Sequence, residues 1–192
     1  MNIQELVQDI LKRKPTYLFV GENHGDALIK DFVSDLITNL KPHYKSIGLY
    51  LEALVVTSDV QFGNYGGRIY SMRKSVYEPF IQREKNRTVI YGIDDPRHSS
   101  GGHDGKLPPD WIPGDSKERI DTWEKEIAKG DVQLKIVLCG SNHIDTRNDA
   151  ADIVNRYSAT SRFILVNWGK RVGNTSIEVI NGDNRLYEII LE

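Results

Sequence analysis

Short apolar runs and helically spaced apolar residues alternate along this chain, which begins with an amphipathic helix predicted for residues 1–14. Nearly continuous apolar runs predict strands at 17–20, 47–51, 88–93, 134–139 and 162–166. Apolar residues at helical spacing predict further helices at 26–40, 68–85, 117–129 and 148–157. Strands that alternate with helices are typical of a mostly parallel central sheet flanked by helices. We therefore predict an α/β fold.

The C-terminal part of the chain has a different pattern of apolar residues. Residues 177–180 and 186–191 are separated by the turn-forming sequence Asn181-Gly182-Asp183-Asn184, which predicts an antiparallel β-hairpin added to the sheet. Near the N-terminus, the order strand, helix, strand predicts a right-handed crossover that makes 17–20 and 47–51 parallel neighbours. A length of 192 residues with 39% hydrophobic residues suits one core, so we predict a single domain over 1–192.

Charge and composition narrow the classes of partner. The 25 basic and 27 acidic residues give a net charge of −2, so we predict no nucleic-acid partner. No apolar run approaches the roughly 20 residues of a membrane span, and the N-terminus lacks the layout of a signal peptide. The lone cysteine, Cys139, lies within an apolar run and is predicted to be buried and inert. We expect a cytoplasmic protein that acts on a small molecule or a peptide.

Two similar turns follow two of the predicted strands. Gly21-Glu22-Asn23-His24 follows the first, and Gly140-Ser141-Asn142-His143 follows the fourth. Glu52 ends the second strand and Asp94 ends the third. Because the carboxyl ends of parallel strands meet along one edge of a sheet, we expect these side chains to converge. The predicted catalytic set is Glu22, His24, Glu52 and His143.

Three interpretations of this set are open. His24, Glu52, His143 and Asp94 are ligand types that suit Mn, Fe or Zn, so they predict a divalent metal site. Alternatively, His24 acts as a general base on water while Glu22 or Glu52 orients it. The simplest interpretation has no chemistry: both segments are turns in which glycine permits the bend and the polar residues cap the next helix.

Several common catalytic routes lack their sequence signals. The chain contains no His-Glu-x-x-His pattern, no Gly-x-Ser-x-Gly pattern and no Walker loop. Ser141, beside His143, is a weak candidate nucleophile, and Cys139 lies inside a strand. The irregular stretch 96–116 is long for a connection in a compact domain, which indicates a lid, a binding loop or disorder.

The spacing Gly-Glu-x-His, a later strand-ending Glu and a distal Gly-x-x-His resembles a known superfamily. Gly21-Glu22-Asn23-His24, Glu52 and Gly140-Ser141-Asn142-His143 carry the likeness. The superfamily includes the ChaN-like haem-uptake proteins, the TIKI/TraB proteases and the erythromycin esterases, and similar domains occur in dermonecrotic and mitogenic bacterial toxins. The Glu-to-His spacing here is two residues rather than the three of the esterases. The resemblance implies a Tiki-like α/β fold and a site made from Glu22, His24, Glu52 and His143.

The resemblance implies three functions that the sequence leaves open. The first is a hydrolase, metal-dependent or not, of the esterase or protease kind. The second is a haem or small-ligand binding protein, with His98 and His103 as cofactor-binding residues and Tyr50 or Tyr65 as further axial donors. The third is a toxin-effector domain, which would be delivered to a host cell.

Overall fold

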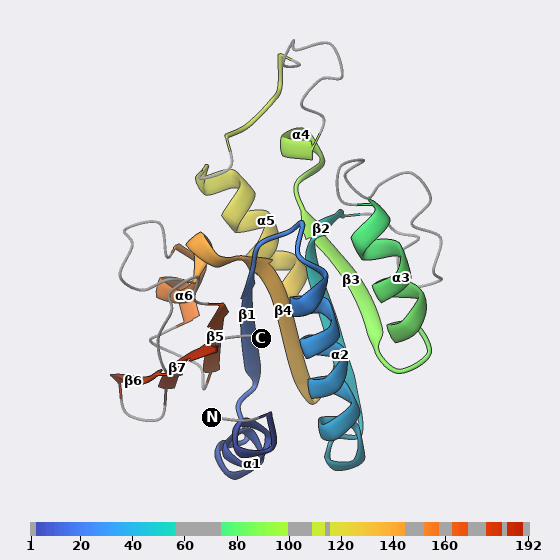
Figure 1. Cartoon of the computed structure of the whole chain (residues 1–192). Helices are drawn as coiled ribbons and strands as arrows, with labels where there is room; N and C mark the ends of the chain where they lie inside the picture. The colour runs from blue at the N-terminus through green and yellow to red at the C-terminus, as the bar shows by residue number, and fades with distance from the viewer. Residues whose placement is uncertain are drawn as a thin grey trace.

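A twisted sheet lies between two layers of helices in the computed structural model of the chain (Figure 1). The structure describes residues 3–56, 74–99, 109–113, 116–144, 152–157, 163–168, 176–181 and 184–189. The strands of the described part are β1 (Tyr17–Glu22), β2 (Ile47–Val55), β3 (Val89–Asp94), β4 (Leu134–Gly140), β5 (Phe163–Trp168), β6 (Ser176–Asn181) and β7 (Asn184–Ile189). Their order in the sheet is β3-β2-β4-β1-β5-β7-β6. The predicted mostly parallel α/β fold is confirmed.

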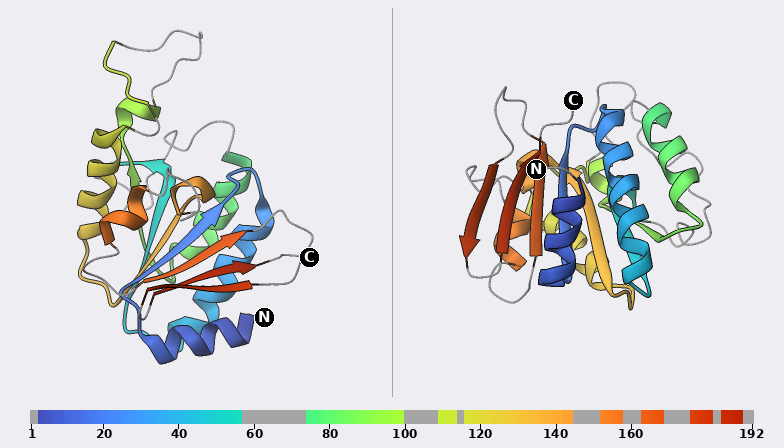
Figure 2. Two further views of the ribbon diagram at one scale, coloured as in Figure 1. Left: turned by 90° about the vertical axis from the view of Figure 1, so that its left-hand side faces the viewer. Right: turned by 60° about the horizontal axis from the view of Figure 1, so that its bottom comes forward.

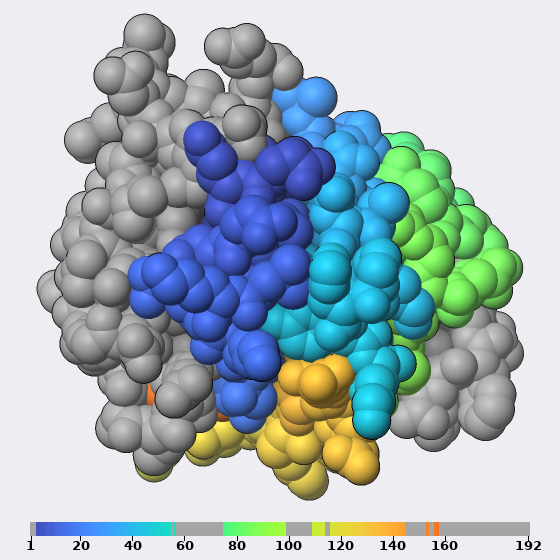
Figure 3. Space-filling model, turned by 90° about the horizontal axis from the view of Figure 1, so that it is seen from below, coloured from blue at the N-terminus to red at the C-terminus, as the bar shows by residue number. Residues whose placement is uncertain are grey.

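Helices cover both faces of this sheet (Figures 1 and 2). The described helices are α1 (Ile3–Arg13), α2 (Ala27–Leu40), α3 (Lys74–Glu84), α4 (Pro96–Ser99), α5 (Lys117–Ala128) and α6 (Asp152–Tyr157), with short 3-10 turns η1 (Lys41–His43) and η4 (Ser141–His143). On one face, α1, α2 and α3 pack against the sheet; on the other, α5 and α6 do. Seen from below, α1 lies alongside α2 (Figure 3). Among the described residues, no helix has the length and apolar character needed to cross a membrane.

Alternate residues of each central strand enter opposite cores. In β1, Leu18 and Val20 pack under α2, whereas Phe19 packs on the α5 side with Tyr50 of β2. All of these side chains are buried, which explains why the strands read as continuous apolar runs. Cys139 is buried in β4, as predicted.

The predicted adjacency of β1 and β2 is wrong. Both strands are parallel, but β4 lies between them and pairs with each. A crossover helix fixes the handedness of the connection and the parallel direction of the two strands that it joins. It does not fix whether those strands are adjacent in the sheet, and here the later strand β4 lies between β1 and β2. Glu22 lies opposite Gly140 in the register of β1 and β4. The prediction that Glu52 ends the second strand is wrong, because β2 continues to Val55. The end of β4 is therefore flanked by the end of β1 and by the part of β2 that bears Glu52.

The C-terminal hairpin is present, with one difference from the prediction. β6 and β7 are antiparallel to each other, but β7 joins the sheet parallel to β5. Only β6 runs against the other described strands. The sheet thus stays parallel as far as β7.

Helix boundaries follow their sequence signals. Asp26 caps α2 by accepting a hydrogen bond from Leu28 N, and Ser116 caps α5 by accepting one from Arg119 N. Pro79 lies inside α3 and does not end the helix, which continues to Glu84. Within the irregular stretch 96–116, the structure adds the single-turn helix α4. Residues 68–73, 100–108, 114–115 and 148–151, which also carry sequence predictions, lie outside the described residues.

Candidate functional site

The two Gly-x-x-His turns meet at the carboxyl edge of the sheet, on either side of Glu52. His24 Nε2 lies 3.5 Å from Glu52 Oε2, and His143 Nε2 lies 4.0 Å from Glu52 Oε1. The histidine side chains are 19% and 16% exposed, whereas that of Glu52 is 5% exposed. Two partly buried imidazoles therefore lie beside one buried carboxylate.

Gly140 lies at the centre of this group. A Cβ atom built on Gly140 would be 3.4 Å from His24 Nε2, 3.5 Å from Glu52 Oε2 and 3.5 Å from His143 Cδ2. The three side chains thus converge on one small volume that the absence of a side chain leaves open. The backbone of Gly140 has φ of −54° and ψ of 138°, which any residue can adopt, so backbone conformation does not require glycine here.

His24 is held by the buried carboxylate two residues before it. Its Nδ1 lies 2.6 Å from Glu22 Oε1, and that same oxygen accepts a hydrogen bond from the Tyr77 hydroxyl. Burial disfavours the imidazolium, but hydrogen bonds to Glu22 and Glu52 outweigh burial and raise the pKa of His24 to about 9. At neutral pH the ring is therefore a cation that donates from both nitrogens.

Glu52 is fixed by donors on both of its oxygens. Arg119 Nη2 lies 2.7 Å from Oε1, and the backbone N–H of Gly140 donates to Oε2 at 2.6 Å. Burial alone would raise the pKa of Glu52, but hydrogen bonding and attraction to His24, with Arg119 and His143 adding to them, hold it well below its ordinary value. Glu52 is therefore an ionised hub for the site.

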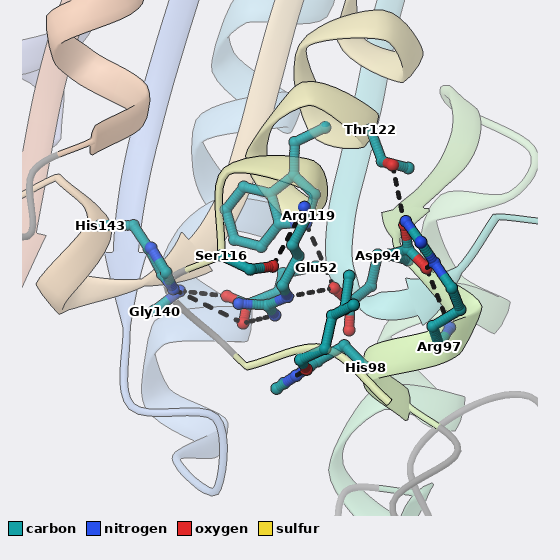
Figure 4. A network of polar contacts seen from close by, with 12 residues as sticks. Glu52, Asp94, Arg97, His98, Ser116, Arg119, Thr122, Gly140 and His143 are labelled. Atoms are coloured by element: carbon teal, nitrogen blue, oxygen red, sulfur yellow. Dashed lines mark hydrogen bonds and ion pairs between the residues drawn. The ribbon is translucent and has the colours of Figure 1, made fainter. Parts of the chain in front are cut away.

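Arg119 links Glu52 to Asp94 (Figure 4). Its Nε lies 2.6 Å from Asp94 Oδ1, which also accepts a hydrogen bond of 3.2 Å from Trp123 Nε1. The guanidinium packs over the Trp123 ring at 4.6 Å, and His143 also contacts that ring, with ring centroids 4.8 Å apart. One tryptophan of α5 thus supports both the arginine and the distal histidine.

These contacts do not fit the predicted divalent metal. Asp94, predicted as a ligand, faces the guanidinium and the indole N–H, and Glu52 shares the same guanidinium. A metal at these carboxylates would lie beside a fixed positive charge, and His24 would have to give up the proton that Glu22 and Glu52 stabilise. Among the described residues, no group of three or more His, Cys, Asp or Glu side chains has metal-binding geometry.

The predicted haem ligands differ in their placement and burial. Tyr50 is wrong as an axial donor, because it is buried in β2 and its hydroxyl donates to Lys129 O at 2.7 Å. His98 is partly buried in α4, with Nδ1 3.0 Å from Ile112 O and its ring 6.0 Å from that of Trp111. His103 and Tyr65 lie outside the described residues.

Sequence reasoning missed the counter-charges Arg119 and Lys30, the latter in an ion pair with Glu22. The sequence could have indicated both, because each is a charged residue on the apolar stripe of a predicted helix. Arg119 precedes Trp123 by four positions, and Lys30 precedes Val33 by three. A charge at such a position has to meet an opposite charge inside the fold.

The raised pKa of His24 predicts a stability that falls with rising pH. The ordinary pKa of histidine is 6.5 and the pKa of His24 in the folded protein is about 9, so the charged ring contributes its full stabilisation below pH ~6.5. This contribution to the free energy of unfolding, up to roughly 3 kcal/mol, is lost as the pH rises through about 9. Urea unfolding of the wild type and His24→Gln across this range measures it: the decline should occur only in the wild type. An NMR-titrated pKa of His24 at or below 6.5 would contradict the prediction.

Comparisons with known proteins support the fold. No protein-family model matches the chain, and no curated protein matches its sequence. Among solved structures, it is similar to ChaN of Campylobacter jejuni, described with cofacially bound haem, at a TM-score of 0.61 and 13% identity over 98% of this chain and 92% of that one. It is also similar to the type III effector HopBA1, at a TM-score of 0.57 and 14% identity, with the same coverage of 98% and 92%. The resemblance to TIKI proteases and erythromycin esterases stays a prediction.

Proposed function

We propose that the protein is a hydrolase in which His143 is the general base and His24 the general acid. The observation that carries the proposal is the convergence of His24, Glu52 and His143 within 3.4 to 3.5 Å of the open position beside Gly140. Two imidazoles in reach of one small volume can take a proton from water and return one to a leaving group.

The protonation of His24 supports this division of roles. Glu22 and Glu52 keep His24 charged at neutral pH, so it begins the reaction with a proton to give. This differs from the sequence interpretation of His24 as a base. His143 then removes a proton from water as the water oxygen attacks the ester or amide carbonyl carbon, and His24 Nε2 protonates the departing oxygen or nitrogen. Proton transfer from His143 to His24, through water, restores both groups.

The buried carboxylates and Arg119 hold this arrangement in place. Glu22 orients His24 through Nδ1, and Glu52 offers its negative charge to both imidazoles. Arg119 and the Gly140 N–H fix Glu52 so that it does not rotate into the substrate volume. Fixed charges of this kind stabilise a transition state without reorganising during the reaction.

Gly140→Ala tests the location of the reaction. The added methyl makes only ordinary contacts at 3.4 to 3.5 Å, so we expect the variant to fold. It fills the volume between the two histidines, and we expect hydrolysis of p-nitrophenyl butyrate or of a fluorogenic peptide to fall by about 10²-fold. Gly25→Ala is the matched control, because a Cβ at Gly25 meets nothing within 4 Å. Equal activity of the two variants would place the reaction elsewhere.

His98 favours haem binding as a second candidate function. Donation from its Nδ1 to Ile112 O leaves the lone pair of Nε2 for a ligand, which is the tautomer and orientation typical of metal-binding histidines. The neighbouring Trp111 ring adds an aromatic surface, and ChaN of Campylobacter jejuni, a haem binder, has a similar fold. When bound through His98, haem would supply a redox-active iron.

Titration with haemin tests this second function. A Soret shift that appears with the wild type and is lost in His98→Ala, but kept in His43→Ala, is the expected result. His43 is an exposed histidine in η1 and controls for surface binding of haemin. A spectrum equal to that of free haemin would end the proposal of haem binding.

A further inference from the structure

A buried lysine and a buried tyrosine contact the carboxylate that holds His24. Lys30 of α2 forms an ion pair with Glu22 Oε2, and the Tyr77 hydroxyl of α3 donates to Glu22 Oε1. His24 Nδ1 lies 2.6 Å from the same Oε1. Two different helices therefore set the orientation of one carboxylate at the end of β1.

Lys30 also holds the backbone of the turn. Its Nζ donates to His24 O at 3.0 Å and to Asn23 O at 3.5 Å. The ammonium lies 4.5 Å from the centroid of the Tyr77 ring, a cation–π contact. The side chain and the backbone of the histidine turn are thus fixed by the same cation.

Burying these polar and charged side chains in the core costs free energy. Lys30, Glu22 and Tyr77 are almost fully buried, and a buried ion pair often stabilises a fold no better than apolar residues of equal volume. What the polar groups provide, and apolar ones would not, is a fixed direction for the Glu22 carboxylate.

We propose that Lys30 and Tyr77 are positioning residues that fix the Glu22 carboxylate and, through it, the ring of His24, so that Nε2 points into the volume beside Gly140. Only the catalytic consequence of this inference rests on the proposed hydrolase function. When one of the two donors is removed, the Glu22 carboxylate rotates and the His24 ring samples other orientations. The proton donor is then misdirected, which lowers kcat and leaves KM unchanged.

Two variants with matched controls test the inference. Tyr77→Phe removes one hydroxyl and keeps the ring, and Tyr44→Phe does the same at another buried tyrosine. Lys30→Met removes the ammonium, and Lys41→Met removes one that donates to Arg87 O. The readout is the ¹⁵N–¹H NMR signal of His24 Nδ1–H, which a held hydrogen bond shifts to low field and protects from exchange with water.

We expect this signal in the wild type and both controls, and its loss in Tyr77→Phe and Lys30→Met. Its persistence in folded Tyr77→Phe would overturn the inference, as would its absence from the wild type. If Lys30→Met fails to fold, Tyr77→Phe decides the result. The expected NMR pattern in a protein without hydrolytic activity would support the positioning roles and refute the hydrolase, so the two proposals fail separately.

Discussion

Arg119→Met should lower the free energy of unfolding by about 3 to 5 kcal/mol, the range observed when one partner of a buried ion pair is removed. The guanidinium compensates Glu52 and Asp94 at once, at 2.7 and 2.6 Å. Methionine keeps much of the side-chain volume, so the loss reports the uncompensated carboxylates rather than a cavity. Chemical denaturation at neutral pH measures the change.

Arg156→Met is the matched control for this substitution. Arg156 also pairs with two carboxylates, but the side chains of these partners, Asp121 and Glu124, are 49% and 48% exposed, and such surface pairs contribute at most about 1 kcal/mol. Comparable losses in the two variants would mean that Arg119 does not compensate buried charge. Because the site's hub is Glu52, Arg119→Met should also disturb the titration of His24.

His24→Gln and His143→Gln should each reduce kcat/KM for the hydrolysed probe ester by about 10²- to 10⁴-fold, the usual contribution of a general acid or base. Glutamine keeps a polar side chain near each position but transfers no proton at neutral pH. The double variant should be little worse than the single ones, since an acid and a base that act in one step depend on each other.

The pH profile separates the two roles. Wild-type activity should fall as the pH rises through about 9, because His24 then loses the proton that it donates. The residual activity of His24→Gln should lack this alkaline fall. His43→Gln, at a histidine on the surface, should behave as the wild type. Full activity in either site variant would remove that histidine from the mechanism.

The local sequence predicts which residues reach the rim, because each lies near the carboxyl end of a strand and strand ends are local features, although β2 continues past Glu52 to Val55. Glu22, His24, Glu52 and His143 were placed together on this basis, and they do lie together. Whether they catalyse a reaction stays a prediction. Tyr50 shows the limit of such reasoning, since its side chain, only two residues before Glu52, enters the core instead.

The long-range features could not be predicted from local pattern. The position of β4 between β1 and β2 depends on which strand edges are unpaired when β4 joins the sheet. The sequence of a single helix or strand carries no information about that. Arg119 acts on Glu52 across 67 positions, and Tyr77 on Glu22 across 55. Their roles emerge only when α3 and α5 are packed on opposite faces of the sheet.

The central strand β4 comes late in the chain, so assembly of the site depends on a strand that is made after β1 and β2. β1 finds both of its neighbours, β4 and β5, only in the second half of the sequence. Until β4 is made, β1 and β2 present open edges, which are sites of mispairing in a nascent protein. His24 and Glu52 meanwhile have no common neighbour. The side chains of the site are therefore brought together only once β4 has paired with both β1 and β2.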